Sequence, residues 1–438
     1  MVQLQFINKL LDTQDTSIII KNNLTEDYFS NYINEYAFIN EHMNKYNKIP
    51  DKQTFLEKFP NFDIIVVAED FDYLISELYK DKNWRAIQKA TREIPTLYAK
   101  DDLDAALNKL RSIVETADKT KHLEVKDILQ DTNERYEIFL DKIGNLSKHY
   151  IHTGFKELDR ILGGWDRQEE LATIAARTNQ GKTWILLKAA AAAIEQGLRV
   201  GIYSGEMDVT KIAYRIDTLL AKTTNISLSN YGLTHGNREI QNKYKSWLDS
   251  LTKKYPNASC KILTPAMIDG PAGVNALRSF IEKENIDILF VDQHSLLEDD
   301  RKGRTPIEKA SNISRDLKNL QVMKKIPIIT ASQLNREKNE TGPDTTNISQ
   351  SDRIGQDSTT IIMFEQDKEH KLMTMHLVKS RDSVNGLKLT YSIDLDKGEF
   401  VYMPDESDAL DNLPTLPIDE SMYTDNELDE DAEWETWD

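Results

Sequence analysis

Apolar residues follow two different spacings along this chain, and the first spacing is helical. Before about residue 115, apolar and aromatic positions recur every three or four residues, which is typical of the buried face of a helix. The clearest run consists of Tyr28, Phe29, Tyr32, Ile33, Tyr36 and Ile39. The proline of KIPDKQTFLEKF precedes Asp51 and Thr54, two residue types that start helices. We therefore predict a small all-helical N-terminal domain over residues 1–115.

The next segment, residues 116–150, is mostly polar and charged. Within it, LEVKDILQDTNERYEIFLDKI has a helical spacing and stops at Gly144, a residue type that ends helices. These features predict a linker that carries its own helix.

After His152 the chain changes to short β-rich runs that alternate with longer helical stretches. The β-rich runs include LATIAA, RVGIYS, IDILFVD and IPIITAS, and GKTWILLKAAAAAIEQ is the first helical stretch. This alternation predicts an α/β domain over residues 151–404, with a mainly parallel sheet and helices on its faces. In the last third, TTIIMFEQD, KLMTMHLVKSR and GLKLTYSIDLD are joined by short polar turns. We expect these strands to extend the sheet in antiparallel fashion.

Composition excludes several classes of protein. The chain has 438 residues, of which 39% are hydrophobic, and it contains no apolar run long enough to cross a bilayer. Its start lacks the apolar segment of a signal peptide, so the cytoplasm is the expected compartment and no membrane partner is expected. A single cysteine, Cys260, allows neither an internal disulfide nor a Cys-rich zinc site, and a buried thiol is the expected role.

The acidity of the chain belongs to its end. The net charge is −18, but residues 405–438 hold 14 acidic residues and no Lys or Arg, which leaves −18 + 14 = −4 for the first 404 residues. Binding of nucleic acid by the body of the protein is therefore not excluded. The segment 405–438 is predicted to be a disordered acidic tail. Its end, EWETWD, suits either docking on a basic and partly apolar surface, such as a partner or a DNA channel, or simple solvation.

A phosphate-binding loop is the strongest chemical signal in the sequence. Backbone N–H groups and a following helix N-terminus favour a polyphosphate, a lysine can reach the β- and γ-phosphates, and a threonine hydroxyl can bind Mg²⁺. The loop consists of Ala176, Arg177, Thr178, Asn179, Gln180, Gly181, Lys182 and Thr183. Ala176 replaces the usual first glycine, and so degenerate a loop also occurs by chance. The strand before it and the helix after it favour the functional interpretation.

Three polar residues end neighbouring β-rich runs. Asp292 ends IDILFVD, where its carboxylate can hold Mg²⁺ opposite Thr183, or can merely end a strand. Glu206, in YSGEM, can orient the attacking water as a base, or can be an acid at the N-terminus of the next helix. Gln333, in ITASQLNRE, can sense the γ-phosphate or cap a loop. The presence of Lys182 and Thr183 upstream favours the metal role of Asp292, whereas the residues alone do not separate the alternatives for Glu206 and Gln333.

Five segments between His152 and about Phe400 resemble one family in order and approximate spacing. They are TGFKELDRILGG, AARTNQGKT, YSGEMD, ILFVDQHSLL and ASQLNRE. The family is that of the DnaB-type replicative helicases, which are hexameric motors with a RecA-like P-loop fold and include phage-encoded members. The N-terminal helices resemble, less closely, the helical N-terminal domain of the same family.

The resemblance implies a role for each matching residue at the nucleotide site. Lys182 and Thr183 would bind the phosphates and Mg²⁺, and Asp292 would be the second Mg²⁺ partner. Glu206 would be the catalytic carboxylate, and Gln333 the γ-phosphate sensor.

Two further segments resemble elements of the family outside that site. Lys379 and Arg381, in VKSRDSVNG, resemble a Lys-x-Arg element that inserts an arginine finger into the ATP site of a neighbouring subunit; the alternative is a basic hairpin turn. NISQSDRIGQDSTTIIMF resembles a shortened DNA-binding loop, which makes Arg353 and Gly355 the expected DNA contacts. Gln293-His294 replaces an aromatic-apolar pair of the family, so His294 is either a polar group behind the site or a satisfied surface histidine.

The function implied by the resemblance is that of an ATP-dependent replicative DNA helicase. Such an enzyme uses ATP and Mg²⁺, forms a hexameric ring around single-stranded DNA, moves 5′ to 3′ at a fork, and works with a primase and a helicase loader. A RecA-, RadA- or KaiC-like ATPase is one alternative, against which the helical N-terminal domain, linker helix and Lys-x-Arg element argue. A loader or structural protein that binds nucleotide without hydrolysis is another, and the presence of Lys182, Glu206 and Asp292 argues against it.

Overall fold

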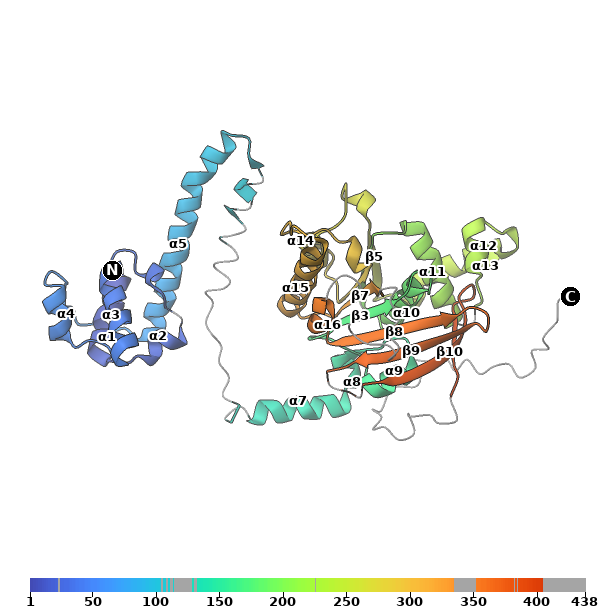
Figure 1. The fold of residues 1–438 in the computed structure, drawn as a ribbon, viewed down its shortest axis with the longest axis horizontal. Helices are drawn as coiled ribbons and strands as arrows, with labels where there is room; N and C mark the ends of the chain where they lie inside the picture. Colours follow the sequence, from blue (N-terminus) through green and yellow to red (C-terminus); the bar gives the residue numbers. More distant parts are fainter. Residues whose placement is uncertain are drawn as a thin grey trace. The chain divides into compact units, whose positions relative to one another are not determined.

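The fold is described by a computed structural model and has two separate compact units (Figure 1). The structure describes residues 1–103 and 132–404, apart from 23, 225, 335–351, 382 and 384, with a few residues between 104 and 131. The units are residues 1–132 and 133–438. The finer division into helical domain, linker, ATPase domain and tail stays a prediction, and the tail after Pro404 lies outside the described residues.

The first unit is helical, as the apolar spacing predicted. Its elements are α1 (Val2–Thr13), α2 (Ser17–Lys21), η1 (Glu26–Tyr28), α3 (Ile33–Tyr46), α4 (Lys52–Lys58) and α5 (Phe71–Tyr98). All of them contribute to one core, in which Phe6, Tyr36, Phe55 and Leu74 are fully buried. The helical prediction for this region is therefore confirmed.

The aromatic run that begins at Tyr28 does not lie in a single helix. Tyr28 ends the 3-10 turn η1, and α3 begins only at Ile33. Phe29 stacks on Tyr36 with 3.7 Å between ring centroids, so the three- and four-residue spacing arises from a turn folded back on a helix. The start of α4 follows the prediction, because the Asp51 carboxylate accepts a hydrogen bond of 2.8 Å from the Thr54 N–H.

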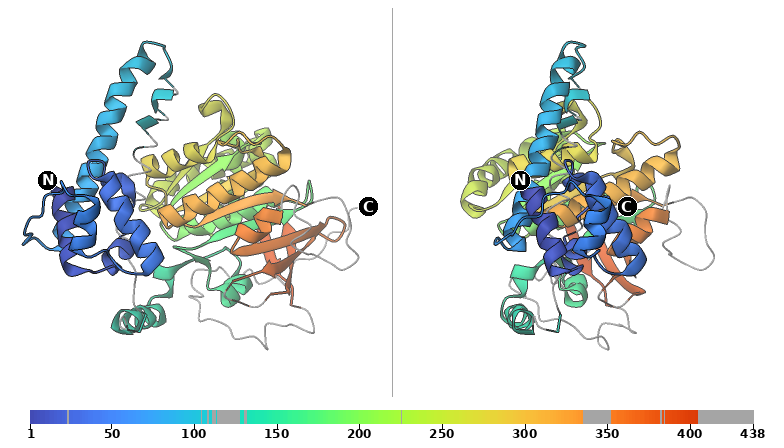
Figure 2. Two further views of the ribbon diagram at one scale, coloured as in Figure 1. Left: turned by 60° about the vertical axis from the view of Figure 1, so that its left-hand side comes forward. Right: turned by 90° about the vertical axis from the view of Figure 1, so that its left-hand side faces the viewer.

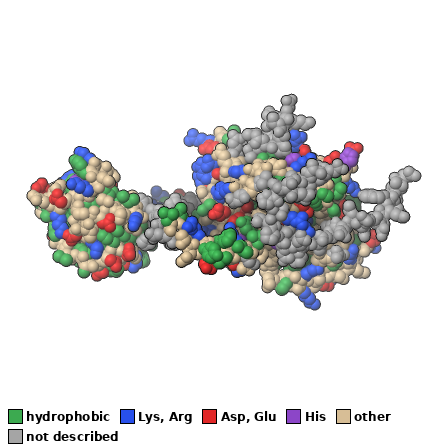
Figure 3. Space-filling view, turned by 90° about the horizontal axis from the view of Figure 1, so that it is seen from below, with side chains coloured by type: hydrophobic (Ala, Val, Ile, Leu, Met, Phe, Trp, Pro, Cys, Tyr) green, Lys and Arg blue, Asp and Glu red, His purple; other side chains and the backbone are tan. Residues whose placement is uncertain are grey.

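The described part of the predicted linker helix is α7 (Thr132–Gly144), which ends at the expected glycine. Tyr136, Phe139, Leu140 and Ile143 lie on one face of α7 by their spacing, and they remain 42% to 68% exposed. Hydrophobic side chains gather on this part of the surface in the view from below (Figure 3). The single chain therefore leaves an apolar helix face accessible.

The second unit is built on a sheet of nine strands within the described residues. The strands are β3 (Leu171–Ala176), β4 (Arg199–Ser204), β5 (Ser259–Leu263), β6 (Ile288–Asp292), β7 (Ile328–Gln333), β8 (Thr360–Asp367), β9 (Leu372–Lys379), β10 (Leu387–Asp394) and β11 (Glu399–Tyr402). Their order is β11-β10-β9-β8-β3-β7-β6-β4-β5. The six strands from β8 to β5 are parallel, and β9, β10 and β11 extend the sheet in antiparallel fashion. Both features of the predicted sheet are confirmed.

Helices cover both faces of this sheet (Figure 2). The other elements are α8 (Leu146–His149), β1 (Tyr150–Ile151), α9 (Lys156–Leu162), β2 (Trp165–Asp166), α10 (Lys182–Glu195), α11 (Val209–Lys222), α12 (Asn230–His235), η2 (Arg238–Ile240), α13 (Gln241–Lys254), η3 (Pro265–Met267), α14 (Val274–Glu284), η4 (His294–Leu296), α15 (Pro306–Lys324) and α16 (Asp352–Asp357). Along β6, Ile288 and Phe290 pack with α10 and α11, whereas Leu289 and Val291 pack with α14 and α15. Across the described ranges, no helix combines the length and apolar composition that a bilayer span requires.

The two edges of the parallel strands carry different candidate residues. Ala176, Asp292 and Gln333 end their strands at the carboxyl edge, where ligands of α/β proteins collect. Lys379 ends the antiparallel strand β9 and pairs with Ile361, near the start of β8. The end of β9 therefore lies toward the opposite, amino edge of the sheet.

Candidate active site

The phosphate-binding loop joins β3 to α10, as the sequence predicted. The strand is buried from Leu171 to Ala176, and α10 begins at Lys182. Two residues of the loop have positive φ angles, 59° at Asn179 and 84° at Gly181. These conformations turn the chain from the strand into the first turn of α10, where unpaired backbone N–H groups can face an anion.

Lys182 contacts a residue that the sequence analysis did not assign. Its ammonium donates a hydrogen bond of 2.7 Å to the side-chain oxygen of Gln293, directly after β6. Burial lowers the pKa of Lys182, and the Asp292 and Glu206 carboxylates act in the opposite direction. The lysine is thus held at the mouth of the loop by a neutral partner that an anionic phosphate oxygen could replace.

Thr183 and Asp292 are joined as the resemblance implied. The Thr183 hydroxyl donates a hydrogen bond of 3.0 Å to Oδ2 of Asp292. Asp292 is 2% exposed, and its burial raises the pKa of the carboxyl group, as does the nearby Glu206 carboxylate. A hydroxyl and a carboxylate at this distance are the oxygen donors that Mg²⁺ prefers, so the pair fits the predicted metal role.

Glu206 lies at the same edge on an exposed turn after β4. The turn is tied to β6, because the Gly205 N–H donates a hydrogen bond of 2.7 Å to the Asp292 carbonyl oxygen. A Cβ at Gly205 would lie 2.7 Å from the Leu296 Cβ, so the turn requires glycine. Asp208, not Glu206, caps α11, with bonds of 2.9 and 3.1 Å from the N–H groups of Thr210 and Lys211. The alternative role for Glu206 as the helix-capping acid is therefore filled by another residue.

Gln333 reaches the phosphate loop from the end of β7. Its side-chain amide donates a hydrogen bond of 2.8 Å to the Thr178 hydroxyl, and its backbone pairs with Ala176. On the other side of the loop, the Gln180 side-chain oxygen accepts a hydrogen bond from the Gln366 N–H. Gln333 is thus positioned to respond to a change in the loop.

Arg381 lies far from this set of residues in its own chain. It follows the end of β9, and register places Lys379 beside Ile361, one residue past the pair Ala172–Thr360. Ile361 pairs in turn with Thr173, three residues before Ala176, so the end of β9 lies roughly 10 Å back along the strand direction from Ala176, because each residue of a strand advances about 3.3 Å. The structure groups Lys182, Thr183, Glu206, Asp292 and Gln333 at one edge and separates Lys379 and Arg381 from them.

Lys379 is tied to the helix that carries the candidate DNA contacts. Its ammonium donates to the carbonyl oxygens of Gly355, Gln356 and Ser358 at 2.8, 3.3 and 2.7 Å. These carbonyls lie at the C-terminal end of α16, where a cation is favoured. The Arg353 side chain donates to Asp357 at 3.3 Å along the same helix. The rest of the predicted DNA-binding loop, residues 347–351, lies outside the described residues.

The sequence analysis did not identify Arg215, and it left open whether His294 lies behind the site or at the surface. Arg215, on α11, lies 5.0 Å from the Trp184 ring centroid and interacts electrostatically with Asp292. Its position on a helix far from the loop in sequence gave no signal. His294 is 2% exposed, its Nε2 has no hydrogen-bond partner in the described structure, and burial lowers its pKa to about 4. Of the two alternatives for His294, the satisfied surface histidine is therefore wrong, and a buried position behind the site remains.

Cys260 lies half-buried in β5. Burial raises the pKa of its thiol to about 12, so the thiolate is disfavoured. The sequence predicted a buried thiol, and Cys260 is partly buried.

Comparisons with known proteins give the class of this one. The family described as DnaB-like helicase C terminal domain matches residues 150–395. The replicative DNA helicase DnaB of Geobacillus stearothermophilus is 26% identical over 319 residues, which is 69% of this chain and 68% of that protein. The replicative DNA helicase DnaB of Treponema pallidum (strain Nichols) is 27% identical over 267 residues, 60% of this chain and 57% of that protein.

Solved structures share the fold. A DnaB-like replicative helicase, described with its interactions with primase, superposes with a TM-score of 0.68 and 19% identity over 91% of this chain and 98% of its own. A second solved structure, an isolated ATPase domain, superposes with a TM-score of 0.55 and 22% identity over 64% of this chain and 100% of its own. Fold, phosphate loop and family together define the class of an ATP-hydrolysing replicative DNA helicase. The chain belongs to the DnaB-like helicase family.

Proposed function

We propose that this chain is the motor subunit of a helicase ring that uses ATP and Mg²⁺ to move along single-stranded DNA and open the duplex at a replication fork. The observation that carries the proposal is a pair of adjacent contacts at the start of α10. Lys182 contacts Gln293, directly after β6, and Thr183 contacts Asp292, the last residue of β6. They place an ammonium and a hydroxyl at the phosphate loop beside a buried carboxylate. Those are the groups that phosphoryl transfer requires.

Each residue at the carboxyl edge then has a distinct task. The loop N–H groups and Lys182 bind the phosphates, with Lys182 exchanging Gln293 for phosphate oxygens. Thr183 and Asp292 would hold Mg²⁺, which would neutralise phosphate charge when bound. Glu206 orients the attacking water and accepts its proton, and Gln333 senses the γ-phosphate through the loop.

The position of Arg381 supports a ring of several copies. Because Arg381 lies toward the opposite edge from Lys182 of its own chain, its guanidinium suits the ATP site of a neighbouring copy. The exposed apolar face of α7 also supports association with a second copy. By family resemblance the ring is a hexamer, moves 5′ to 3′ and acts in the cytoplasm. The relative whose structure was described with primase makes a primase an expected partner, together with a loader.

DNA contact is assigned to Arg353 and Gly355 of α16. Lys379 links this helix to the strand that carries Arg381. We infer that Lys379 is a positioning residue that couples β9 to α16. Arg381 alone then enters the ATP site of the neighbouring copy.

The test of the proposed function is ATP hydrolysis with and without single-stranded DNA. We expect a basal rate that rises when an oligonucleotide is added, because a motor that moves on the strand hydrolyses ATP faster when engaged. Hydrolysis that is indifferent to DNA would contradict a DNA motor, and binding of ATP without hydrolysis would favour a structural or loader protein.

Replacing Lys379 by methionine tests whether this lysine positions α16 or contacts the phosphate in a neighbouring ATP site. We expect Lys379→Met to retain ATP binding and to weaken binding of a single-stranded oligonucleotide about tenfold, because the lost hydrogen bonds hold α16 in position. A tenfold change is about 1.4 kcal/mol, so only a part of their energy needs to reach DNA binding. Lys388→Met, on the exposed side of the neighbouring strand β10, is the matched control. If Lys379→Met leaves DNA affinity intact and slows hydrolysis as severely as loss of Arg381, the lysine contacts the phosphate and the positioning role is wrong.

A further inference from the structure

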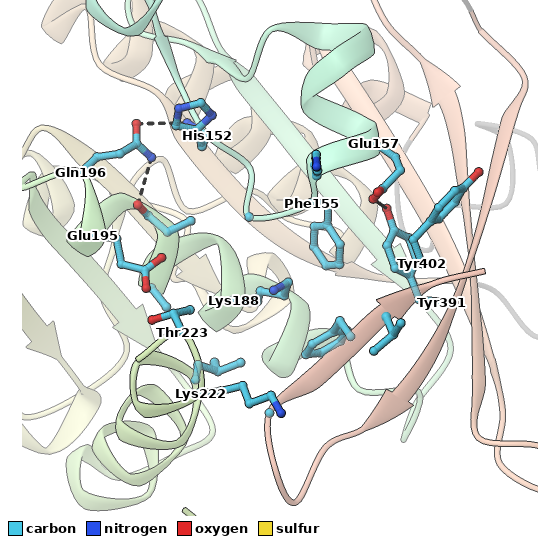
Figure 4. Close-up of a pocket in the computed structure, with 18 of the residues that line it drawn as sticks. His152, Phe155, Glu157, Lys188, Glu195, Gln196, Lys222, Thr223, Tyr391 and Tyr402 are labelled. Carbon is cyan, nitrogen blue, oxygen red and sulfur yellow. Dashed lines mark hydrogen bonds between the residues drawn. The ribbon is translucent and has the colours of Figure 1, made fainter. Parts of the chain in front are cut away.

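A cavity of about 390 Å³ lies in the second unit, apart from the nucleotide site. It is bounded by α9, the C-terminal half of α10, the end of α11 and the strands β10 and β11. Figure 4 shows Lys188 in the middle of it, between Glu195 and Phe155. The volume is within the range of pockets that bind small molecules or single aromatic side chains.

Lys188 is a partly buried lysine that forms no ion pair among the described residues. Its ammonium lies 5.3 Å from the Phe155 ring centroid and 5.1 Å from the Phe400 ring centroid. Within the described structure, it makes neither a hydrogen bond nor an ion pair, although Glu157, Glu195 and Asp159 are near enough to interact electrostatically. Burial lowers its pKa, so a bound carboxylate would favour its charged form.

Glu157 and Glu195, the two glutamates that line the cavity, are in an environment that disfavours their charged forms, and Glu157 already has a hydrogen-bond partner. The Tyr391 hydroxyl donates a hydrogen bond of 3.1 Å to Glu157. Burial raises the pKa of both Glu157 and Glu195. The lining contains four Lys or Arg side chains and two Glu side chains, and of the four cations Lys222 is already paired with Glu399 at 2.6 Å. Three basic side chains thus remain beside two glutamates, so the cavity suits an acidic occupant.

The chain itself supplies such an occupant beside the cavity. Val401 and Tyr402 line the cavity, and the acidic segment 405–438 begins three residues after Tyr402. This segment holds 14 carboxylates and, near its end, Trp434 and Trp437 among acidic neighbours. As a random coil, the 28 residues before Glu433 would reach roughly 30 Å. Attachment at the rim also gives a local concentration on the order of millimolar.

We propose that residues 433–438 dock into the Lys188 cavity of their own chain, with a tryptophan against Phe155 and Phe400 and a carboxylate against the Lys188 ammonium. An indole buries a large apolar area and tolerates a cation at its face, so both parts of the cavity are used. The occupant is the acidic end of this chain, and its docking requires neither a bound nucleotide nor DNA.

The test uses the full chain and a fluorescent peptide of residues 420–438. In the wild-type chain the tethered segment occupies the cavity and competes with the added peptide. We therefore expect the peptide to bind the wild-type chain at least tenfold more weakly than it binds the full chain carrying Trp434→Ala and Trp437→Ala. Fluorescence anisotropy at low salt measures both affinities, because salt screens the charge contribution. Equal affinities would contradict the proposal.

Substitutions of residues that line the cavity test whether the peptide binds there. Added to the double-tryptophan variant, Lys188→Gln should lower peptide affinity at least tenfold, and Arg160→Gln at the rim should lower it less. Lys211→Gln, an exposed lysine of α11 outside the cavity, should leave it unchanged. A melting curve for each variant shows whether it is folded; if Lys188→Gln is not, Arg160→Gln decides. Binding that is insensitive to the cavity variants, or that is displaced by a single-stranded oligonucleotide, would place the segment elsewhere.

A zero-length carboxyl-to-amine cross-link then identifies the chain that supplies the segment. We expect links between residues 433–438 and the lysines of the cavity within one chain. In a mixture of isotopically light and heavy protein, links that join light to heavy chains would contradict docking within one chain.

Discussion

Arg381→Ala is expected to leave ATP binding near the wild-type level and to slow hydrolysis by about 10³- to 10⁵-fold, the usual contribution of an arginine finger. The physical reason is the place of Arg381 beyond the end of β9, away from Lys182 and Thr183 of its own chain. A guanidinium supplied by a neighbour stabilises charge that develops in the transition state, so binding of the ground state is little affected. Steady-state hydrolysis and equilibrium binding of a labelled ATP analogue measure the two effects. Arg238→Ala, an exposed arginine of η2, is the matched control.

Mixing two inactive chains tests whether the arginine acts between copies. Arg381→Ala chains keep Glu206, and Glu206→Gln chains keep Arg381, so an interface between the two variants can receive both intact groups. We expect part of the activity to return at intermediate ratios. If no ratio restores hydrolysis, the arginine does not act in a neighbouring site.

Lys182→Ala and Glu206→Gln are expected to fail at different steps. Lys182 is the ammonium held at the phosphate loop, so its loss should abolish nucleotide binding. Glu206 lies at the same edge but outside the loop, so Glu206→Gln should retain ATP and slow hydrolysis by about 10²- to 10⁴-fold, the typical contribution of a general base. Filter binding and single-turnover hydrolysis separate the two outcomes.

Asp208→Asn is the control for the assignment of the base. Asp208 lies two residues after Glu206, and asparagine retains the ability to cap α11. We expect Asp208→Asn to hydrolyse ATP at nearly the wild-type rate. Wild-type hydrolysis by Glu206→Gln would show that another residue activates the water.

The phosphate loop could be predicted because its chemistry is local. Lys182 and Thr183 are adjacent in sequence, and a strand before them and a helix after them are enough to define their setting. Asp292 was recognisable for a similar reason, since it ends a run of buried β-rich residues. The parallel sheet then brings the ends of β3 and β6 to the same edge.

Residues that act through long-range contacts could not be predicted in the same way. The contact of Gln293 with Lys182 joins positions 111 residues apart, and that of Lys379 with Gly355 depends on the register of β9 beside β8. The aromatic run from Tyr28 had helical spacing but folds as a turn packed on α3, because Phe29 stacks on Tyr36. His294 was expected to be either behind the site or at the surface, and only the packing of η4 shows that it is buried.

Separation of a forked duplex tests the central claim most directly. A radiolabelled or fluorescent fork with single-stranded arms is incubated with the full chain, ATP and Mg²⁺, and free strand is measured over time. We predict strand separation that requires ATP, is lost in Lys182→Ala and is strongly reduced in Arg381→Ala. Hydrolysis stimulated by single-stranded DNA without any separation of the fork would contradict the assignment as a replicative helicase motor.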